Sequence, residues 1–339
     1  SGHARRMEQQ TSPPDPAKEQ AAAAMRHATA EEGKLDAAER RRVVDAAIAN
    51  LRQHYIHPEV AEKMAAELQN HQKRGDYDAS TDGSAFAMLL TRDLREVSHD
   101  QHLAMFYSRE KTSEAPDAPS PGDLAQYKRD MEKTNCMFEK AEVLPGHIGY
   151  VKFNEFPDPP TCHARMEAAM HSLQYADAII FDVRENHGGS PEMVALIASY
   201  LFDRPTHLND IYNRGSNSTQ ESWTRPVKGN KLADKPAYVL TSALTFSAAE
   251  EFSYDLKMLK RATLVGETTR GGGHLASMQR IGDHFLISVP DANPINPISK
   301  TNWEGTGVEP DVKVKAADAL QTAKALAEEK LRQKNLPKK

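Results

Sequence analysis

The sequence predicts an α/β protein that begins with a bundle of three helices. Apolar residues recur at helical spacing in three successive segments between Leu35 and Leu94. Further along, continuous apolar runs such as 178–183 and 237–240 alternate with helical patterns, as buried parallel strands do between helices. A chain of 339 residues has ample material for a core, in one large domain or two ordinary ones.

The composition excludes several classes of protein. The formal charge is −5, so the basic surface of a nucleic-acid binder is missing and we expect no nucleic-acid partner. No run of eighteen apolar residues is present, so we expect no transmembrane segment. Cys136 and Cys162 are the only cysteines and lack a metal-ligand spacing. One disulfide is possible, which leaves the compartment open.

The order of these patterns divides the chain into five regions. The first is rich in Ala, Glu, Gln and Pro, and the third holds several prolines and a glycine. The predicted regions are a mobile tail (1–33), a helical bundle ending in a His-bearing segment (34–108), a linker (109–130), an α/β domain (131–315) and a C-terminal helix (316–339).

Ser247 lies where a predicted strand passes into a predicted helix. The apolar run 237–240 precedes it, and apolar residues recur at three- and four-residue steps from Ala248. A hydroxyl there can project from the first helical turn, beside free backbone N–H groups that can receive negative charge. This geometry suits a nucleophile, because attack creates an oxyanion near those amides. The alternative is that Ser247 only caps the helix.

Three other segments could contribute chemistry. Gly188 and Gly189 follow a buried strand, where their backbone N–H groups could form an oxyanion hole; a tight turn or a phosphate loop is the alternative, and the GxGxxG and Walker spacings are both absent. His102 lies three residues after His99, but no HExxH or completing cluster supports a metal site, so we predict no metal. Glu304, in a Gly- and Pro-containing loop, would alone be a solvated charge.

Together these segments resemble the C-terminal-processing (tail-specific) proteases over roughly residues 145–315. Their Ser-Ala-Ser-Glu motif corresponds to Ser-Ala-Ala-Glu at 247–250, and their Val-Gly-Glu-x-Thr-x-Gly-Lys-Gly motif to residues 265–273. Asp-Val-Arg-Glu-Asn-His-Gly-Gly at 182–189 resembles the family's Asp-Leu-Arg-x-Asn-x-Gly-Gly loop. Gly-Val-Glu-Pro-Asp at 307–311 resembles its closing motif. The resemblance implies a ββα-spiral (crotonase/ClpP-like) fold for 131–315.

The sequence departs from the Ser–Lys members of this family at one position. Gly272 stands where those members carry the general-base lysine. The branch with the tricorn core and the interphotoreceptor retinoid-binding protein modules also lacks that lysine, and tricorn uses a histidine supported by a glutamate. His102 and Glu304 match these two positions. The serine that precedes the tricorn histidine is replaced here by Gln101, so its role is not transferred.

The resemblance implies a serine endopeptidase that acts through an acyl-enzyme on peptides or unfolded proteins. Ser247 would be the nucleophile, His102 the base and Glu304 its orienting carboxylate, with the amides of Ala248 and of Gly188 or Gly189 as the oxyanion hole. The alternatives are a non-catalytic carrier of a hydrophobic, retinoid- or lipid-like ligand and a degenerate regulatory or scaffold protein. We expect no cofactor, a possible homo-oligomer, and a periplasmic or secreted location with the cytoplasm as alternative.

Overall fold

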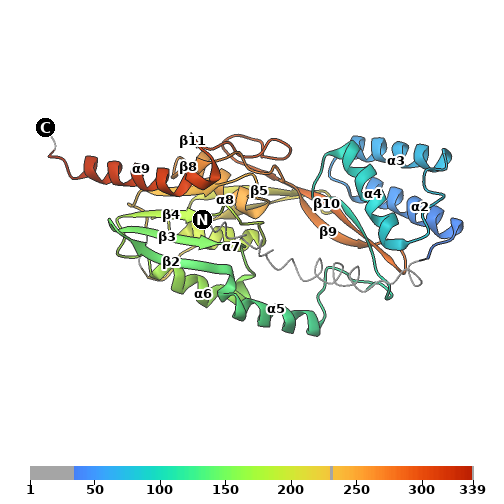
Figure 1. Cartoon of the computed structure of the whole chain (residues 1–339), viewed down its shortest axis with the longest axis horizontal. Coiled ribbons are helices and arrows are strands. Elements are labelled where there is room, and N and C mark those ends of the chain that lie inside the picture. The colour runs from blue at the N-terminus through green and yellow to red at the C-terminus, as the bar shows by residue number, and fades with distance from the viewer. Residues whose placement is uncertain (1–33, 230–231, 338–339) are drawn as a thin grey trace, which may run out of the picture.

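The computed structural model describes residues 34–229 and 232–337 and shows a mixed α/β protein, as predicted. The tail predicted at 1–33 lies outside the described residues. Figure 1 shows three helices at one end of the molecule and a large sheet flanked by helices at the other, with strands β9 and β10 reaching from the first toward the second.

Three consecutive helices form the N-terminal end. Each buries one apolar face, and these faces form one core with side chains of β1 and β10, such as Met105 and Ile287. Asp36 caps the first helix by accepting a hydrogen bond from the N–H of Glu39 (2.8 Å). His99, the C-cap of the last helix, has a φ of 55°. The three are α2 (Ala37–His54), α3 (Pro58–Lys73) and α4 (Gly83–Ser98).

A five-stranded antiparallel sheet joins the two ends. Its order is β1-β10-β5-β6, with β9 also paired to β10. Strand β10 contacts the helices and then continues, past a register shift between Pro290 and Ala292, to pair with β5. The strands are β1 (Ala104–Tyr107), β5 (His207–Asn213), β6 (Ser218–Trp223), β9 (Leu275–Arg280) and β10 (Phe285–Ile295).

A six-stranded sheet forms the other end, in the order β11-β8-β7-β4-β3-β2. All of its pairings are parallel except that of β2 with β3, so the carboxyl ends of β4 and β7 lie side by side. The strands are β2 (Phe138–Leu144), β3 (Ile148–Phe153), β4 (Ala178–Asp182), β7 (Ala237–Thr241), β8 (Ala262–Gly266) and β11 (Val312–Lys313).

Helices cover both faces of this sheet because its strands are apolar on both faces. Phe181 and Val239 belong to the core shared with α6, α7 and α8, whereas Ile180 and Leu240 pack against the small residues of α9. Figure 1 shows α9 and α6 on opposite sides of the sheet. The helices are α6 (Pro159–His171), α7 (Pro191–Ser199), α8 (Ala248–Met258) and α9 (Ala319–Lys334), with 3-10 turns η1 (Asn135–Met137) and η2 (Ala316–Asp318).

The linker predicted over 109–130 differs from the structure from residue 121 onward. Helix α5 (Pro121–Lys133) begins there, with a capping box between Ser120 and Asp123. Pro121 is tolerated because the first helical turn needs no N–H from it. Tyr127 and Met131 are buried against the large core, which anchors the helix.

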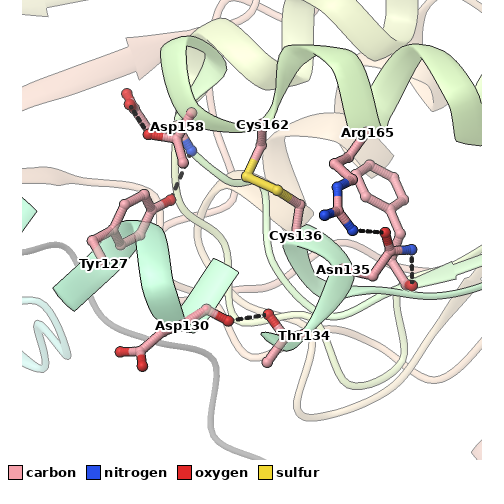
Figure 2. The surroundings of a disulfide bond; sticks show 10 residues. Tyr127, Asp130, Thr134, Asn135, Cys136, Asp158, Cys162 and Arg165 are labelled. Carbon is pink, nitrogen blue, oxygen red and sulfur yellow. Dashed lines mark hydrogen bonds between the residues drawn. A yellow bond between two sulfur atoms is a disulfide. The ribbon is translucent and has the colours of Figure 1, made fainter. Parts of the chain in front are cut away.

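A disulfide between Cys136 and Cys162 joins turn η1 to helix α6 (Figure 2). Polar contacts surround it: Arg165 donates to the side-chain oxygen of Asn135 (2.7 Å), and the N–H of Asp158 donates to the Tyr127 hydroxyl (2.9 Å). The cysteines that the sequence left as a possible pair are therefore bonded, and they tie the edge of the six-stranded sheet to its covering helices.

Candidate active site

Ser247 occupies the turn between strand β7 and helix α8, as the sequence predicts. Its φ is 57°, which a residue with a side chain rarely adopts. The neighbouring backbone holds it there, because Phe246 N–H donates to the carbonyl of Asn186 (3.1 Å) and Ser247 N–H donates to the carboxylate of Glu250 (3.0 Å). Strained backbone that is fixed in this way is typical of functional residues.

His102 reaches Ser247 from a distant part of the chain. Its Nε2 lies 3.1 Å from the Ser247 Oγ, although 145 residues separate the two. His102 belongs to the connection between α4 and β1, where its N–H donates to Asp100 (3.0 Å) and its carbonyl accepts from the Ser288 hydroxyl (2.9 Å). The imidazole stacks on the Phe246 ring with 4.7 Å between centroids. These contacts fix both the backbone and the ring.

Glu304 lies close to His102. Carboxylate oxygens of Asp100 and Glu304 and a ring nitrogen of His102 all lie within 4.8 Å of one another. Glu304 accepts a hydrogen bond from Gly273 N–H (2.5 Å). Burial, and then the charge of Asp100, raise the pKa of Glu304 to about 7. The structure thus brings Ser247, His102 and Glu304 into one cluster.

The glycine pair at 188–189 lies directly against Ser247. A side chain on Gly188 would approach the Ala248 nitrogen to 2.8 Å, and one on Gly189 would overlap the Phe156 carbonyl. Both have positive φ, 102° and 136°, so other residues are disfavoured there. The Gly188 N–H donates to the Asn186 side chain (2.9 Å). Within the described part of the chain, no hydrogen bond from the N–H groups of Gly189 and Ala248 to a protein acceptor is found.

Comparison with known families shows to which protein family this chain belongs. A sequence model of the N-terminal domain of S41 peptidases in eukaryotic IRBP matches residues 36–141. A model of peptidase family S41 matches residues 147–314. The chain belongs to peptidase family S41. This confirms the resemblance found in the sequence and places both His102 and Ser247 within the matched ranges.

Individual relatives agree with this placement. The carboxyl-terminal-processing protease of Synechocystis sp. is 33% identical over 156 residues, which cover 45% of this chain and 35% of that protein. The chloroplastic C-terminal processing peptidase of Tetradesmus obliquus is 26% identical over 261 residues, 71% of this chain and 53% of that protein. The chain thus spans about a third to a half of these curated relatives. No helix in the described residues is both long and apolar enough to span a membrane.

Solved structures share the fold at low identity. The tricorn protease superposes with a TM-score of 0.55 at 14% identity, over 86% of this chain and 37% of that chain. A lipoprotein from Streptococcus agalactiae gives 0.57 at 12% identity, over 86% and 96% of the two chains. At such identities the likeness concerns the fold alone.

The structure explains why this S41 chain carries glycine where the Ser–Lys members carry lysine. A side chain built on Gly272 would overlap the ring of Phe246, which stacks on His102. The guanidinium of Arg270 lies 4.5 Å from the centroid of the same ring and pairs with the Gln101 side chain. The space beside Ser247 is therefore filled by the residue that supports the imidazole.

Sequence reasoning missed three residues that join this cluster. The Tyr55 hydroxyl (2.9 Å) and the His274 Nδ1 (2.7 Å) both contact the Asp100 carboxylate. His274 also lies 3.4 Å from Glu304. Two signals were available: Asp100 belongs to the His-bearing segment, and His274 directly follows the motif at 265–273. Tyr55 is the C-cap residue of helix α2, and no feature of the sequence indicated that it belongs to the cluster.

Two of these added residues, Asp100 and His274, shift each other's pKa in opposite directions. Burial opposes ionisation of Asp100, yet the hydrogen bond and positive charge of His274 outweigh it and lower the Asp100 pKa. Burial likewise opposes the charge of His274, but the hydrogen bond and charge of Asp100, followed by the charge of Glu304, raise its pKa. His274 and Asp100 thus each favour the charged form of the other.

Two sets of side chains within the described residues are close enough to hold a metal. One is Asp100, His102 and Glu304, and the other is His207, Asp210 and Glu221 on the β5–β6 hairpin. In the first set His102 already bonds to Ser247, and in the second His207 already pairs with Asp210 at 2.6 Å. The absence of a catalytic metal therefore stays a prediction.

Proposed function

We propose that this chain is a serine endopeptidase that hydrolyses peptides or unfolded proteins through an acyl-enzyme. The observation that carries the proposal is the 3.1 Å contact between the His102 Nε2 and the Ser247 Oγ, with Ser247 inside the range matched by the model of family S41. A neutral imidazole at this distance can accept the serine proton, which makes the hydroxyl nucleophilic near neutral pH.

Each residue of the cluster has its own role in the reaction. Ser247 attacks the peptide carbonyl while His102 takes its proton, and the resulting imidazolium faces the carboxylates of Glu304 and Asp100. The N–H groups of Ala248 and Gly189 hold the oxyanion; between the two glycines predicted for this role, Gly189 is favoured because Gly188 already donates to Asn186. His102 then protonates the leaving amine, and water repeats the sequence to release the acyl group.

We extend the proposal to the setting of the enzyme. The parallel sheet with α6, α7 and α8 on one face is consistent with the ββα-spiral description, and helices α2 to α4 with a three-helix bundle. The disulfide supports an oxidising compartment, hence a periplasmic or secreted location. A homo-oligomer stays a prediction.

A carrier of a hydrophobic ligand is the second candidate. The observation that favours it is the match of residues 36–141 to a domain described from eukaryotic IRBP. A carrier has no use for an activated serine, so the Ser247–His102 contact favours the peptidase.

Cleavage of an unfolded protein tests the proposal. Casein is incubated with the wild type and with Ser247→Ala, and new peptide termini are identified by mass spectrometry. We expect cleavage by the wild type alone, with equal thermal stability of both proteins. Cleavage that continues in Ser247→Ala would refute the assignment of the nucleophile. No cleavage by either, together with saturable retinol binding, would favour the carrier.

A further inference from the structure

A second group of acidic residues lies outside the catalytic cluster, on helix α8. Glu251 and Asp255 are one helical turn apart on the same face, and their exposed fractions are only 5% and 1%. Asn209, on strand β5, is fully buried beside them and donates from Nδ2 to the Glu251 carboxylate (3.3 Å). We call Glu251, Asp255 and Asn209 the acidic pocket.

The acidic pocket has no positive partner. No Lys, Arg or His forms an ion pair with Glu251 or Asp255 among the residues that the structure describes. Two buried carboxylates without a counter-charge cost far more than a fold tolerates. Something else must neutralise them.

Three oxygen atoms of the pocket also lack a hydrogen-bond partner among the described residues. Both carboxylate oxygens of Asp255 and the side-chain oxygen of Asn209 have no partner among residues 34–229 and 232–337. The amide of Asn296 is near enough to favour the Asp255 charge but does not hydrogen-bond to it. Unsatisfied buried groups of this kind require an explanation such as a bound ion.

A proton and a cation are the two ways to remove the charge. A proton on Asp255 supplies a single donor, whereas both Asp255 oxygens and the Asn209 Oδ1 lack a partner among the described residues. A cation contacts several oxygens at once, at about 2.3–2.6 Å for Ca²⁺, and holds them farther apart than a hydrogen bond does. The potential ligands are all oxygens, which selects a hard cation and disfavours zinc or copper.

We propose that Glu251, Asp255 and Asn209 bind a divalent hard cation, with Ca²⁺ the best match. The ion links helix α8, which begins next to Ser247, to strand β5 of the other sheet. A second contact joins the same helix to the loop before Glu304, because the Tyr254 hydroxyl donates to Ser299 (2.7 Å). The cation would therefore stabilise the support of the catalytic cluster without touching the substrate.

Calcium content and thermal stability test this proposal without any activity assay. The full chain is equilibrated with CaCl₂, dialysed into metal-free buffer at pH 7.5, and analysed by mass spectrometry of the elements. We expect about one Ca²⁺ per chain. Chelation should lower the Tm by about 3 °C or more, and added Ca²⁺ should restore it. Asp255→Asn and Glu251→Gln should lose this response, whereas the control Asp203→Asn, at an exposed site, should keep it.

Two results would overturn the proposal. One is the absence of stoichiometric Ca²⁺ with a Tm that does not change up to about 10 mM CaCl₂. The other is a metal-independent wild type that gains stability as the pH falls from 8 to 6, together with a raised Tm in Asp255→Asn; this pattern would assign the neutralisation to a shared proton. Neither result depends on whether the chain cleaves peptides.

Discussion

The catalytic cluster and the acidic pocket each contain two carboxyl groups, but the surroundings of these groups differ. In the catalytic cluster, Asp100 and Glu304 face the imidazoles of His102 and His274. In the acidic pocket, Glu251 and Asp255 face only amides. Imidazoles exchange protons near neutral pH, and amides do not. The first region is therefore built to move a proton, and the second needs a bound ion.

Two adjacent glutamates show the same contrast on a smaller scale. Glu250 accepts four hydrogen bonds, from the N–H groups of Ser247, Gly271 and Gly272 and from the hydroxyl of Thr269. Glu251, the next residue, accepts one long hydrogen bond, from Asn209. The number of hydrogen-bond donors around a carboxylate, and not its residue type, therefore decides its role. Glu250 fixes the surrounding backbone, whereas Glu251 can bind a ligand.

The largest effect on activity should come from His102→Ala. Loss of a general base should lower kcat/KM by about 10²- to 10⁴-fold, measured on any peptide that the wild type cleaves. His99→Asn is the matched control, because Asn tolerates the left-handed backbone at that position. If the control loses activity and His102→Ala keeps it, the histidine is wrongly assigned.

Glu304→Gln should have the next largest effect. Loss of one charged partner of the imidazolium should lower kcat/KM by about 10- to 100-fold. Because the pKa of Glu304 is raised to about 7, the wild type should lose this support as the pH falls below about 7, and the variant lacks it at every pH. A ratio of wild-type to variant rates that is the same at pH 6 and pH 8 would contradict this role.

Asp100→Asn should affect stability more than turnover. Its folded pKa is lowered, so its contribution to stability is present at pH 7 and is lost as the pH falls through the lowered value, below about 3.8. We expect a Tm several degrees below that of the wild type at pH 7, with the difference shrinking toward pH 3. Equal melting temperatures at pH 7 would show that the bonds from Tyr55 and His274 are not stabilising.

Removal of the disulfide should leave catalysis least affected. The bond closes a 26-residue separation, and its loss should lower the free energy of unfolding by about 3.5 kcal/mol. Because the cysteines lie in η1 and α6, which carry no residue of either carboxyl cluster, kcat/KM of Cys136→Ser/Cys162→Ser should stay within about twofold at temperatures where it is folded. Denaturant melts and kinetics on the same sample measure both quantities.

The sequence predicted residues that belong to local motifs. Ser247 and the glycine pair each follow a buried strand, and apolar spacing predicted α2, α3 and α4. Hydrogen bonds between residues that are far apart in the sequence were not predictable in this way. Tyr55 and His274 meet at Asp100 only because the helical end packs on the five-stranded sheet. Local turn chemistry at Ser120 and Asp123 similarly outweighed the proline content in forming α5.

The acidic pocket shows the limit of periodicity. The predicted apolar stripe of α8 runs through Ala248, Phe252 and Leu256, beside which Glu251 and Asp255 would be polar positions at the edge. Strand β5 belongs to the other sheet, and no local pattern indicates that Asn209 covers them. Burial of these carboxylates is a property of the packed fold alone.

The pH dependence of fluorophosphonate labelling tests the central claim, that His102 activates Ser247, without requiring a known substrate. The second-order rate of labelling is measured from pH 5 to 9 for the wild type and for His102→Ala, with Ser247→Ala as the blank. The wild-type rate should rise through one ionisation with an apparent pKa of roughly 6 to 7.5 and then level off. His102→Ala should label at least about 100-fold more slowly. A wild-type profile that is flat across this range, or equal rates in the wild type and His102→Ala, would contradict the account.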